Sequence, residues 1–243
     1  MLVVFGAGQQ ILAHISLFAK RFPTIESCTI VNRSLNSRLL DLLQQCSQSF
    51  ANVKFQALSS SNDIDKVREA TKKSDIIICA TSSTAPLFPS SWVRDGTHII
   101  LIGSYRPTMK EVDTDLIQRA LPGLGDHRNG PGPVLLVDSI KACQMEAGEL
   151  LDAGVTHDQL QEIGHVVQNT RNRASDRSDD SSAEVMETSY SIERNSLNGA
   201  VTIFKSVGIG IQDVVIASAV LEKALENGIG TQILDYNRRS SDY

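Results

Sequence analysis

The sequence predicts an α/β fold in which helices cover both faces of a doubly wound parallel sheet. Short apolar runs recur along the chain, at residues 2–5, 28–31, 53–55, 76–80, 99–102 and 134–137. Each run is continuous rather than alternating, as in strands that are buried on both faces of a parallel sheet. Helix patterns separate the runs, and that order is typical of βαβ units.

Three segments between these runs have the pattern of helices. In residues 10–20, four side chains (Ile11, His14, Ile15 and Phe18) fall on one stripe. Residues 35–46 carry leucines at positions 39, 40, 42 and 43, and residues 63–70 follow a Ser/Asn-rich stretch that suits a helix N-cap. Right-handed crossovers through these helices would place the six strands in one sheet.

The C-terminal third has a different organisation. Residues 168–199 contain few apolar side chains, so we expect a disordered insertion there. Residues 200–234 predict a strand segment and then a helix, at 214–225, that is apolar almost all round at its start. Such a helix must be buried on all sides, which indicates a second domain or a partner subunit. Residues 235–243 are expected to form a frayed tail.

Composition and charge limit the classes of function. The 243 residues are 41% hydrophobic and 21% charged, which is typical of a globular protein with one large domain or a domain and an appendage. The net charge of −5 provides no attraction to nucleic acid or to an anionic membrane. The longest apolar run, residues 214–221, is far below the ~20 residues that span a bilayer. We therefore expect a soluble, cytoplasmic protein without a signal peptide.

The cysteines and histidines do not form a metal-binding pattern. None of the four cysteines has CxxC spacing, and Cys28 and Cys79 lie inside apolar runs, which predicts buried, reduced thiols. None of the five histidines has a partner at metal-ligand spacing. The sequence therefore predicts no metal site.

A glycine-rich turn after the first apolar run predicts a dinucleotide site. The first glycine makes the tight turn, the second lets the backbone approach a pyrophosphate, and the following helix donates N–H groups. The third small position of the usual pattern is occupied by Ile11, which is a departure from it. The residues expected to hold the pyrophosphate are Gly6, Ala7, Gly8, Gln9 and Gln10.

The end of the second run bears on the choice between NAD(H) and NADP(H). An NAD-selective site places a carboxylate about 20 residues after the glycines, to bind the ribose 2′-OH. This chain has Asn32, Arg33 and Ser34 there instead. A guanidinium pairs with a 2′-phosphate that a carboxylate would repel, so NADP(H) is favoured while NAD(H) stays open.

Small hydroxyl residues follow the fourth run. Thr81, Ser82 and Ser83 would lie at the carboxyl ends of the strands, where open α/β sheets bind ligands. We expect them to line the ribose and nicotinamide, although a plain Ser/Thr turn is the alternative.

These motifs together resemble the ornithine cyclodeaminase/mu-crystallin family over residues 2–233, apart from the 168–199 segment. The matching stretches are residues 6–10, 31–34, 75–82, 96–99, 103–107, 137–139, 146–150 and 204–208, of which Phe204-Lys205-Ser206-Val207-Gly208 is the most specific.

The resemblance implies a Rossmann-type domain at residues 1–167, and it places residues 200–234 with a second domain of the family. Members of the family reduce cyclic imines and ketimines, dehydrogenate amino acids, or cyclodeaminate ornithine or lysine. The resemblance also implies Ser206 near the nicotinamide ring, a small imine or amino-acid substrate, and a homodimer. The region that grips the substrate in the family precedes the first strand and is not in this chain, so no catalytic residue is assigned.

Two departures from the family pattern affect the choice of reaction. Tyr105 stands where cyclodeaminases carry an aspartate, and a phenol is a poor substitute for a carboxylate base near neutral pH. His165 stands where the family usually has glutamate, and we expect a surface histidine. The sequence therefore favours an NADP(H)-dependent oxidoreductase. A cyclodeaminase-like lyase with bound NAD and a non-catalytic NADPH-binding truncated homologue remain alternatives.

Overall fold

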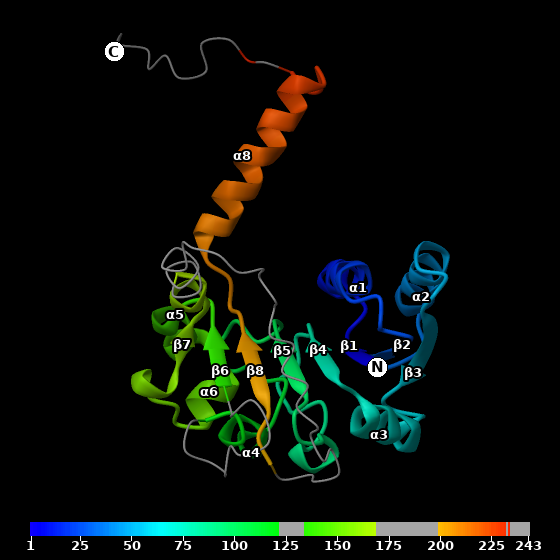
Figure 1. Ribbon diagram of the computed structural model, residues 1–243, viewed down its shortest axis with the longest axis vertical. Helices are drawn as coiled ribbons and strands as arrows, with labels where there is room; N and C mark the ends of the chain where they lie inside the picture. Colours follow the sequence, from blue (N-terminus) through cyan, green and yellow to red (C-terminus); the bar gives the residue numbers. More distant parts are fainter. Residues whose placement is uncertain (122–133, 169–198, 232, 234–243) are drawn as a thin grey trace, which may run out of the picture. The chain divides into compact units, whose positions relative to one another are not determined.

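The computed structural model describes residues 1–121, 134–168, 199–231 and 233 of the chain (Figure 1). Residue contacts divide the chain into two units, residues 1–207 and residues 208–243. The first unit contains one sheet, in which every described pair of neighbouring strands is parallel. Its strand order is β3-β2-β1-β4-β5-β8-β6-β7. The predicted doubly wound α/β fold is therefore confirmed.

The elements follow the apolar runs closely. The strands are β1 (Leu2–Phe5), β2 (Ser27–Asn32), β3 (Lys54–Ser59), β4 (Ile76–Cys79), β5 (His98–Leu101), β6 (Val134–Val137), β7 (Gln161–Glu162) and β8 (Thr202–Lys205). The α-helices with described bounds are α1 (Gln9–Arg21), α2 (Ser37–Ser49), α3 (Ile64–Lys73), α4 (Thr114–Gln118), α5 (Ile140–Glu146), α6 (Gly148–Asp152) and α8 (Gly210–Glu226). Two 3-10 turns, η1 (Ser90–Trp92) and η3 (His157–Gln159), connect them.

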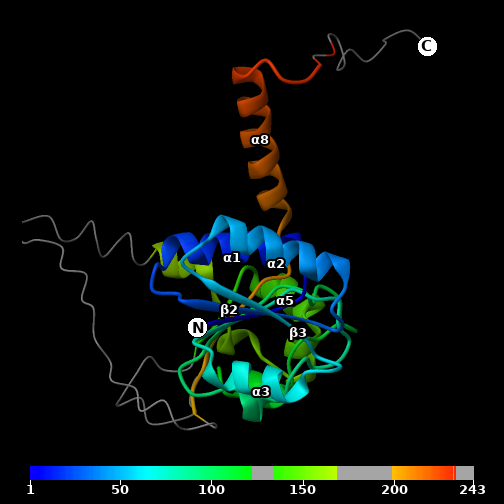
Figure 2. The ribbon, with the colours of Figure 1, turned by 90° about the vertical axis from the view of Figure 1, so that its right-hand side faces the viewer.

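Helices cover both faces of the sheet, as continuous apolar strands require. Figure 2 shows α1 and α2 on one side of the sheet and α3 on the other. Along β1, Leu2 and Val4 pack with the buried residues of α1 and α2, whereas Val3 and Phe5 pack with those of α3 to α6. This alternation follows from the two-residue period of a strand, and it creates two apolar cores.

Strand β8 corrects the expected division of the chain. We expected residues 200–234 to belong together in a second domain, but β8 lies in the main sheet between β5 and β6. Parallel neighbours on both sides satisfy its backbone, and Ile203 packs into the core of the first unit. The first unit continues to residue 207.

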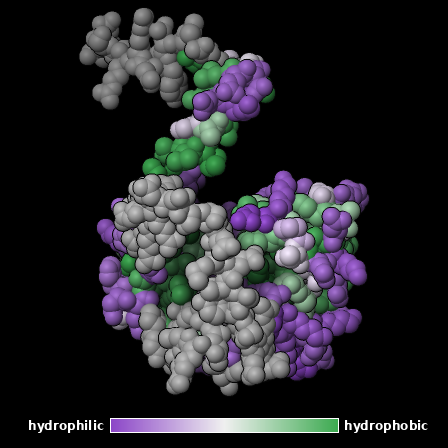
Figure 3. Space-filling view, viewed as in Figure 1, coloured by the Kyte–Doolittle hydropathy of each residue, from purple (hydrophilic) through white to green (hydrophobic). Residues whose placement is uncertain are grey.

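The second unit begins with helix α8. None of its residues is buried, and exposed apolar side chains occur at positions 211, 214, 215, 216, 220, 221 and 225. They appear as green surface along the helix in Figure 3. The burial of this helix against a second domain or a partner subunit remains a prediction.

Other expectations concern segments or groups that the structure describes only partly. The expected insertion, apart from its first and last residues, and the expected tail lie outside the described residues. All four cysteines are free and buried, as predicted for Cys28 and Cys79. None of the described helices has both the length and the apolar composition that crossing a bilayer requires. Within the described residues, no group of three or more potential ligands could hold a metal ion.

Candidate functional site

The strand register brings the ends of six strands to one edge of the sheet. Phe5 at the end of β1 pairs with Val31 and Cys79, and the same level continues through Leu101 and Lys205 to Val137. The residues that follow these strands are therefore neighbours although they are far apart in sequence. Ligands of open α/β sheets bind at this edge, where the strand order reverses.

The reversal occurs between β1 and β4, and a cleft of about 550 Å³ lies there. Such a volume is in the range of small-molecule and cofactor pockets. Among the residues that the structure describes, its lining includes two arginines and no acidic residue, lysine or histidine. The lining residues are Phe5, Gly6, Ala7, Gly8, Val31, Asn32, Arg33, Ser34, Asn36, Arg38, Ser60, Ala80, Thr81, Ser82, Ser83, Pro86 and Leu87.

The turn after β1 has the geometry of a glycine-rich phosphate loop. Gly6 has a φ of +119°, and a Cβ there would lie 2.7 Å from the carbonyl oxygen of Ala80. A Cβ on Gly8 would meet no atom within 4 Å, so the backbone borders open space. Gly8 is the N-cap of α1, and no side chain of the described residues caps that helix. The free N–H groups and the helix dipole favour an anion at this point.

The packing of Ile11 explains why a large side chain is accommodated at the third small position of the usual glycine pattern. Its side chain is fully buried in the core beneath α1, and its Cγ1 would lie 3.3 Å from a Cβ on Gly6. The helix and strand therefore pack around a branched side chain rather than directly against each other.

The end of β2 presents polar groups to the cleft. The Asn32 side chain donates to the carbonyl oxygen of Ser34 at 3.1 Å, and the Ser59 hydroxyl donates to the carbonyl oxygen of Arg33 at 2.9 Å. These bonds hold the loop, while the Arg33 side chain is exposed and has no ion-pair partner among the described residues. A free guanidinium here is suited to pairing with a phosphate.

The loop after β4 forms the other wall. Thr81 and Ser83 are half-buried and Ser82 is exposed, and all three line the cleft. The Thr81 hydroxyl donates to Glu111 at 2.8 Å and accepts from the Ser83 N–H at 3.3 Å.

Three of the predicted residues do not line the cleft. Gln9 and Gln10 are exposed in the first turn of α1, and neither belongs to the residues that line the cleft. The Ser206 hydroxyl donates to Asp138 Oδ2 at 2.7 Å, and that oxygen also accepts from the Val207 N–H at 3.1 Å. Ser206 is thus held at the edge of the sheet beyond β8.

Sequence reasoning missed three polar residues that line the cleft, namely Asn36, Arg38 and Ser60. Asn36 is the N-cap of α2 and accepts from the Leu39 N–H at 3.0 Å. Arg38 lies in the first turn of α2, where a cation is disfavoured by the helix dipole, and that placement was an available signal. Ser60 directly follows β3 at the same sheet edge.

The fold and the position of the cleft together define a Rossmann-type α/β domain as the class of this protein. The chain belongs to the ornithine cyclodeaminase/mu-crystallin family, whose model matches residues 1–228. The resemblance in the sequence is therefore confirmed.

Individual relatives agree with this assignment. The chain is 26% identical to the ketimine reductase mu-crystallin of Rattus norvegicus over 225 residues, covering 91% of this chain and 55% of the relative. The structure of Thermococcus litoralis Δ1-pyrroline-2-carboxylate reductase with NADH and L-proline matches with a TM-score of 0.68 and 24% identity, covering 96% and 60%. The iminosuccinate reductase of Paracoccus denitrificans with NAD⁺ matches with a TM-score of 0.66 and 24% identity, covering 96% and 59%. The chain thus spans little more than half the length of these relatives.

Proposed function

We propose that this chain forms the cofactor-binding part of an NADP(H)-dependent oxidoreductase that reduces a cyclic imine or ketimine, or dehydrogenates an amino acid. The relatives include a ketimine reductase and two structures with NADH or NAD⁺ bound, which supports a nicotinamide cofactor and C=N chemistry. The proposal includes a cytoplasmic homodimer, as expected for the family.

The cationic lining of the cleft carries the preference for NADP(H). Arg33 and Arg38 both line the end of the cleft at β2 and α2, where the adenosine ribose binds in Rossmann-type domains. Asn32 stands where an NAD-selective carboxylate would lie, and the described lining residues include no acidic side chain that would repel a 2′-phosphate. The two guanidinium groups would pair with that phosphate, and the α1 N-terminus would hold the pyrophosphate.

The chain's own residues would then bind and orient the cofactor. The bound nicotinamide supplies the hydride chemistry, in which a C=N carbon gains or loses a hydride. Thr81, Ser82 and Ser83 would flank the ribose on the nicotinamide side, and Asp138 would hold Ser206 in place beside it. Tyr105 is exposed, with the Arg106 guanidinium 5.5 Å from its ring centroid, and it offers no carboxylate for a cyclodeaminase reaction.

Cofactor affinities test this function. Arg33→Ala should weaken NADPH binding about tenfold or more, because a charged hydrogen bond is worth about 1.5–3 kcal/mol, and should change NADH binding only slightly. Fluorescence titration of both nucleotides measures the two dissociation constants. Arg21→Ala, at the far end of α1, is the matched control. Equal losses for NADPH and NADH in Arg33→Ala would remove the assignment.

A second candidate function is NADPH binding without turnover. The observation that favours it is that the described residues lining the cleft include no side chain suited to general acid–base catalysis. An assay of NADPH oxidation with a panel of cyclic ketimines separates the two candidates. Turnover supports the reductase, whereas tight NADPH binding without turnover supports the binding protein.

A further inference from the structure

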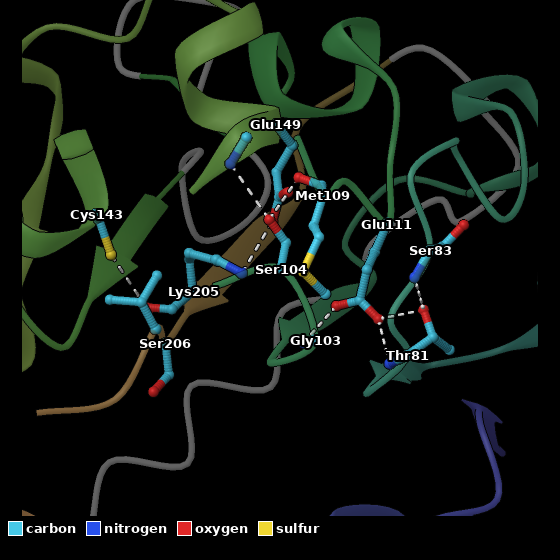
Figure 4. A network of polar contacts seen from close by, with 12 residues as sticks. Thr81, Ser83, Gly103, Ser104, Met109, Glu111, Cys143, Glu149, Lys205 and Ser206 are labelled. Carbon is cyan, nitrogen blue, oxygen red and sulfur yellow. Dashed lines mark hydrogen bonds and ion pairs between the residues drawn. The ribbon is translucent and has the colours of Figure 1, made fainter. Parts of the chain in front are cut away.

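Glu111 lies beneath the cleft, and its side chain is completely buried. Its Oε1 accepts hydrogen bonds from the Thr81 N–H at 2.6 Å and the Thr81 hydroxyl at 2.8 Å. Its Oε2 accepts from the Gly103 N–H at 2.7 Å. Figure 4 shows the carboxylate between these two residues, which belong to the loops after β4 and β5. Both oxygens are thus used by groups from two different loops.

The Glu111 carboxylate accepts hydrogen bonds at the point where the backbone hydrogen bonds between the strands end. The Ala80 N–H still donates to the carbonyl oxygen of Phe5, and the Ile102 N–H donates to that of Cys79. The next residue in each of these two segments is Thr81 or Gly103, and their N–H groups donate to Glu111 instead of to a strand. Burying an unpaired N–H costs about 1–3 kcal/mol, so the carboxylate stabilises both loops where the ladder ends.

The backbone beside Glu111 holds the same loop at two further points. The Lys110 N–H donates to the carbonyl oxygen of Ser83 at 2.9 Å, and the Leu87 N–H donates to that of Glu111 at 2.8 Å. Loop 81–87, which supplies five lining residues of the cleft, is therefore attached to residues 110–111 at its start, at Ser83 and at its end.

The loops after β4 and β5 approach each other too closely to rearrange around a different side chain. A Cβ on Gly103 would lie 1.8 Å from the carbonyl oxygen of Thr81 and 2.6 Å from Glu111 Oε1. In this space the two acceptor oxygens of the Glu111 carboxylate satisfy all three donors.

The charged surroundings of Glu111 make its protonation state significant. Burial raises the pKa of Glu111 above its usual value, although the three hydrogen bonds and the Lys205 ammonium of β8 lower it in part. The other titratable groups nearby are the Cys79 thiol of β4 and Glu149 of α6, which pairs with Lys205. As the pH falls, Glu111 therefore takes up a proton earlier than an ordinary carboxylate does. A protonated carboxyl group has an O–H donor on one of its oxygens. It therefore loses one of the acceptor positions that the Thr81 and Gly103 groups use.

We propose that Glu111 is a positioning residue for the nicotinamide side of the cofactor cleft, acting through Thr81 and loop 81–87. This inference rests on the proposed function. The cleft side formed by β1, β2 and α2 has no contact with Glu111 among the described hydrogen bonds. A ligand that occupies only the adenosine end should therefore be insensitive to Glu111.

The test compares two probes in the 243-residue chain. NADPH occupies the whole cleft, whereas adenosine 2′-monophosphate occupies only the adenosine end. The ratio of their dissociation constants cancels the titration of the 2′-phosphate, which is the one phosphate monoester in each probe. Glu111→Gln replaces one acceptor oxygen with an NH₂ donor, and Glu26→Gln, at an exposed glutamate, is the matched control.

Glu111→Gln is expected to weaken NADPH binding about tenfold while changing adenosine 2′-monophosphate binding less than about twofold. In the unmodified chain, the dissociation constant of NADPH divided by that of the adenosine probe should rise as the pH is lowered from about 8 to about 5. In Glu111→Gln, the same ratio should not change with pH. An unchanged ratio in a folded Glu111→Gln protein would overturn the proposal. If that variant does not fold, the pH series of the unmodified chain decides, and a flat ratio there overturns it. Failure of both probes to bind the unmodified chain would instead remove the proposed function itself.

Discussion

The buried ion pair between Lys205 and Glu149 allows a prediction of stability from the structure. The Lys205 ammonium at the end of β8 lies 3.0 Å from Glu149 Oε1 in α6, and both side chains are fully buried. Within the described residues, neither the ammonium nor the carboxylate has a hydrogen-bond partner of good geometry. The pair therefore offsets its desolvation only through mutual attraction, which is the unfavourable case for a buried ion pair.

The expected magnitudes differ sharply between single and double variants. Lys205→Met leaves a buried carboxylate without its cation, which should lower the free energy of unfolding by about 3–5 kcal/mol. For a domain of this size, about 2–4 °C of melting temperature per kcal/mol gives a fall of about 6–20 °C. The double variant Lys205→Met/Glu149→Leu removes both charges, and it should lie within about 1 kcal/mol of the unmodified chain or above it.

Urea unfolding of the four proteins in this double-mutant cycle measures the coupling. The exposed pair of Asp65 and Arg68 on α3, 2.7 Å apart, provides the control, since Arg68→Met should cost less than about 1 kcal/mol. If the double variant lost the sum of the two single losses, the reasoning from desolvation would be refuted.

Two further predictions concern the packing of the sheet. Gly103→Ala should prevent stable folding or displace loop 81–87, because its Cβ would overlap the carbonyl oxygen of Thr81. The control is Gly164→Ala, where a Cβ meets nothing within 4 Å, and this variant should have the melting temperature of the unmodified chain. His98 lies in β5 with its Nδ1 2.7 Å from the Thr202 hydroxyl, and burial lowers its pKa. The unfolded chain therefore binds that proton more readily, so stability should fall as the pH drops below about 6.5, and His98→Gln should show a shallower loss in urea unfolding at several pH values. Identical pH slopes would contradict the assignment.

Much of the fold was predictable because its signal is local. Continuous apolar runs such as residues 76–80 and the stripe containing Ile11 and Ile15 specify burial independently of their partners, and the strands and helices formed close to the predicted bounds. The strand segment after residue 200 was predicted, but its place in the main sheet was not, because a 32-residue segment of different composition, residues 168–199, precedes it. The terminal lysine of β8 also reads as polar, although Lys205 is fully buried.

The candidate site was predictable where it follows directly from a strand end. Gly6, Gly8, Arg33 and Thr81 each lie within three residues of the end of a parallel strand, so their common location follows from the fold class alone. Arg38 reaches the cleft only because α2 begins where it does. Glu111 reaches Thr81 only through the path of the chain after β5.

The sequence by itself determined the doubly wound class, the glycine-rich turn and the basic end of the cleft, because each depends on local spacing and residue type. The tertiary structure alone decided that β8 lies between β5 and β6, that Glu111 joins two loops, and that Lys205 faces Glu149. These contacts join residues that are 8 to 104 positions apart in the chain, as the bonds of Gly103 with Glu111 and of His98 with Thr202 illustrate. Such pairings arise from the packing of whole elements, and no local pattern of residues encodes them.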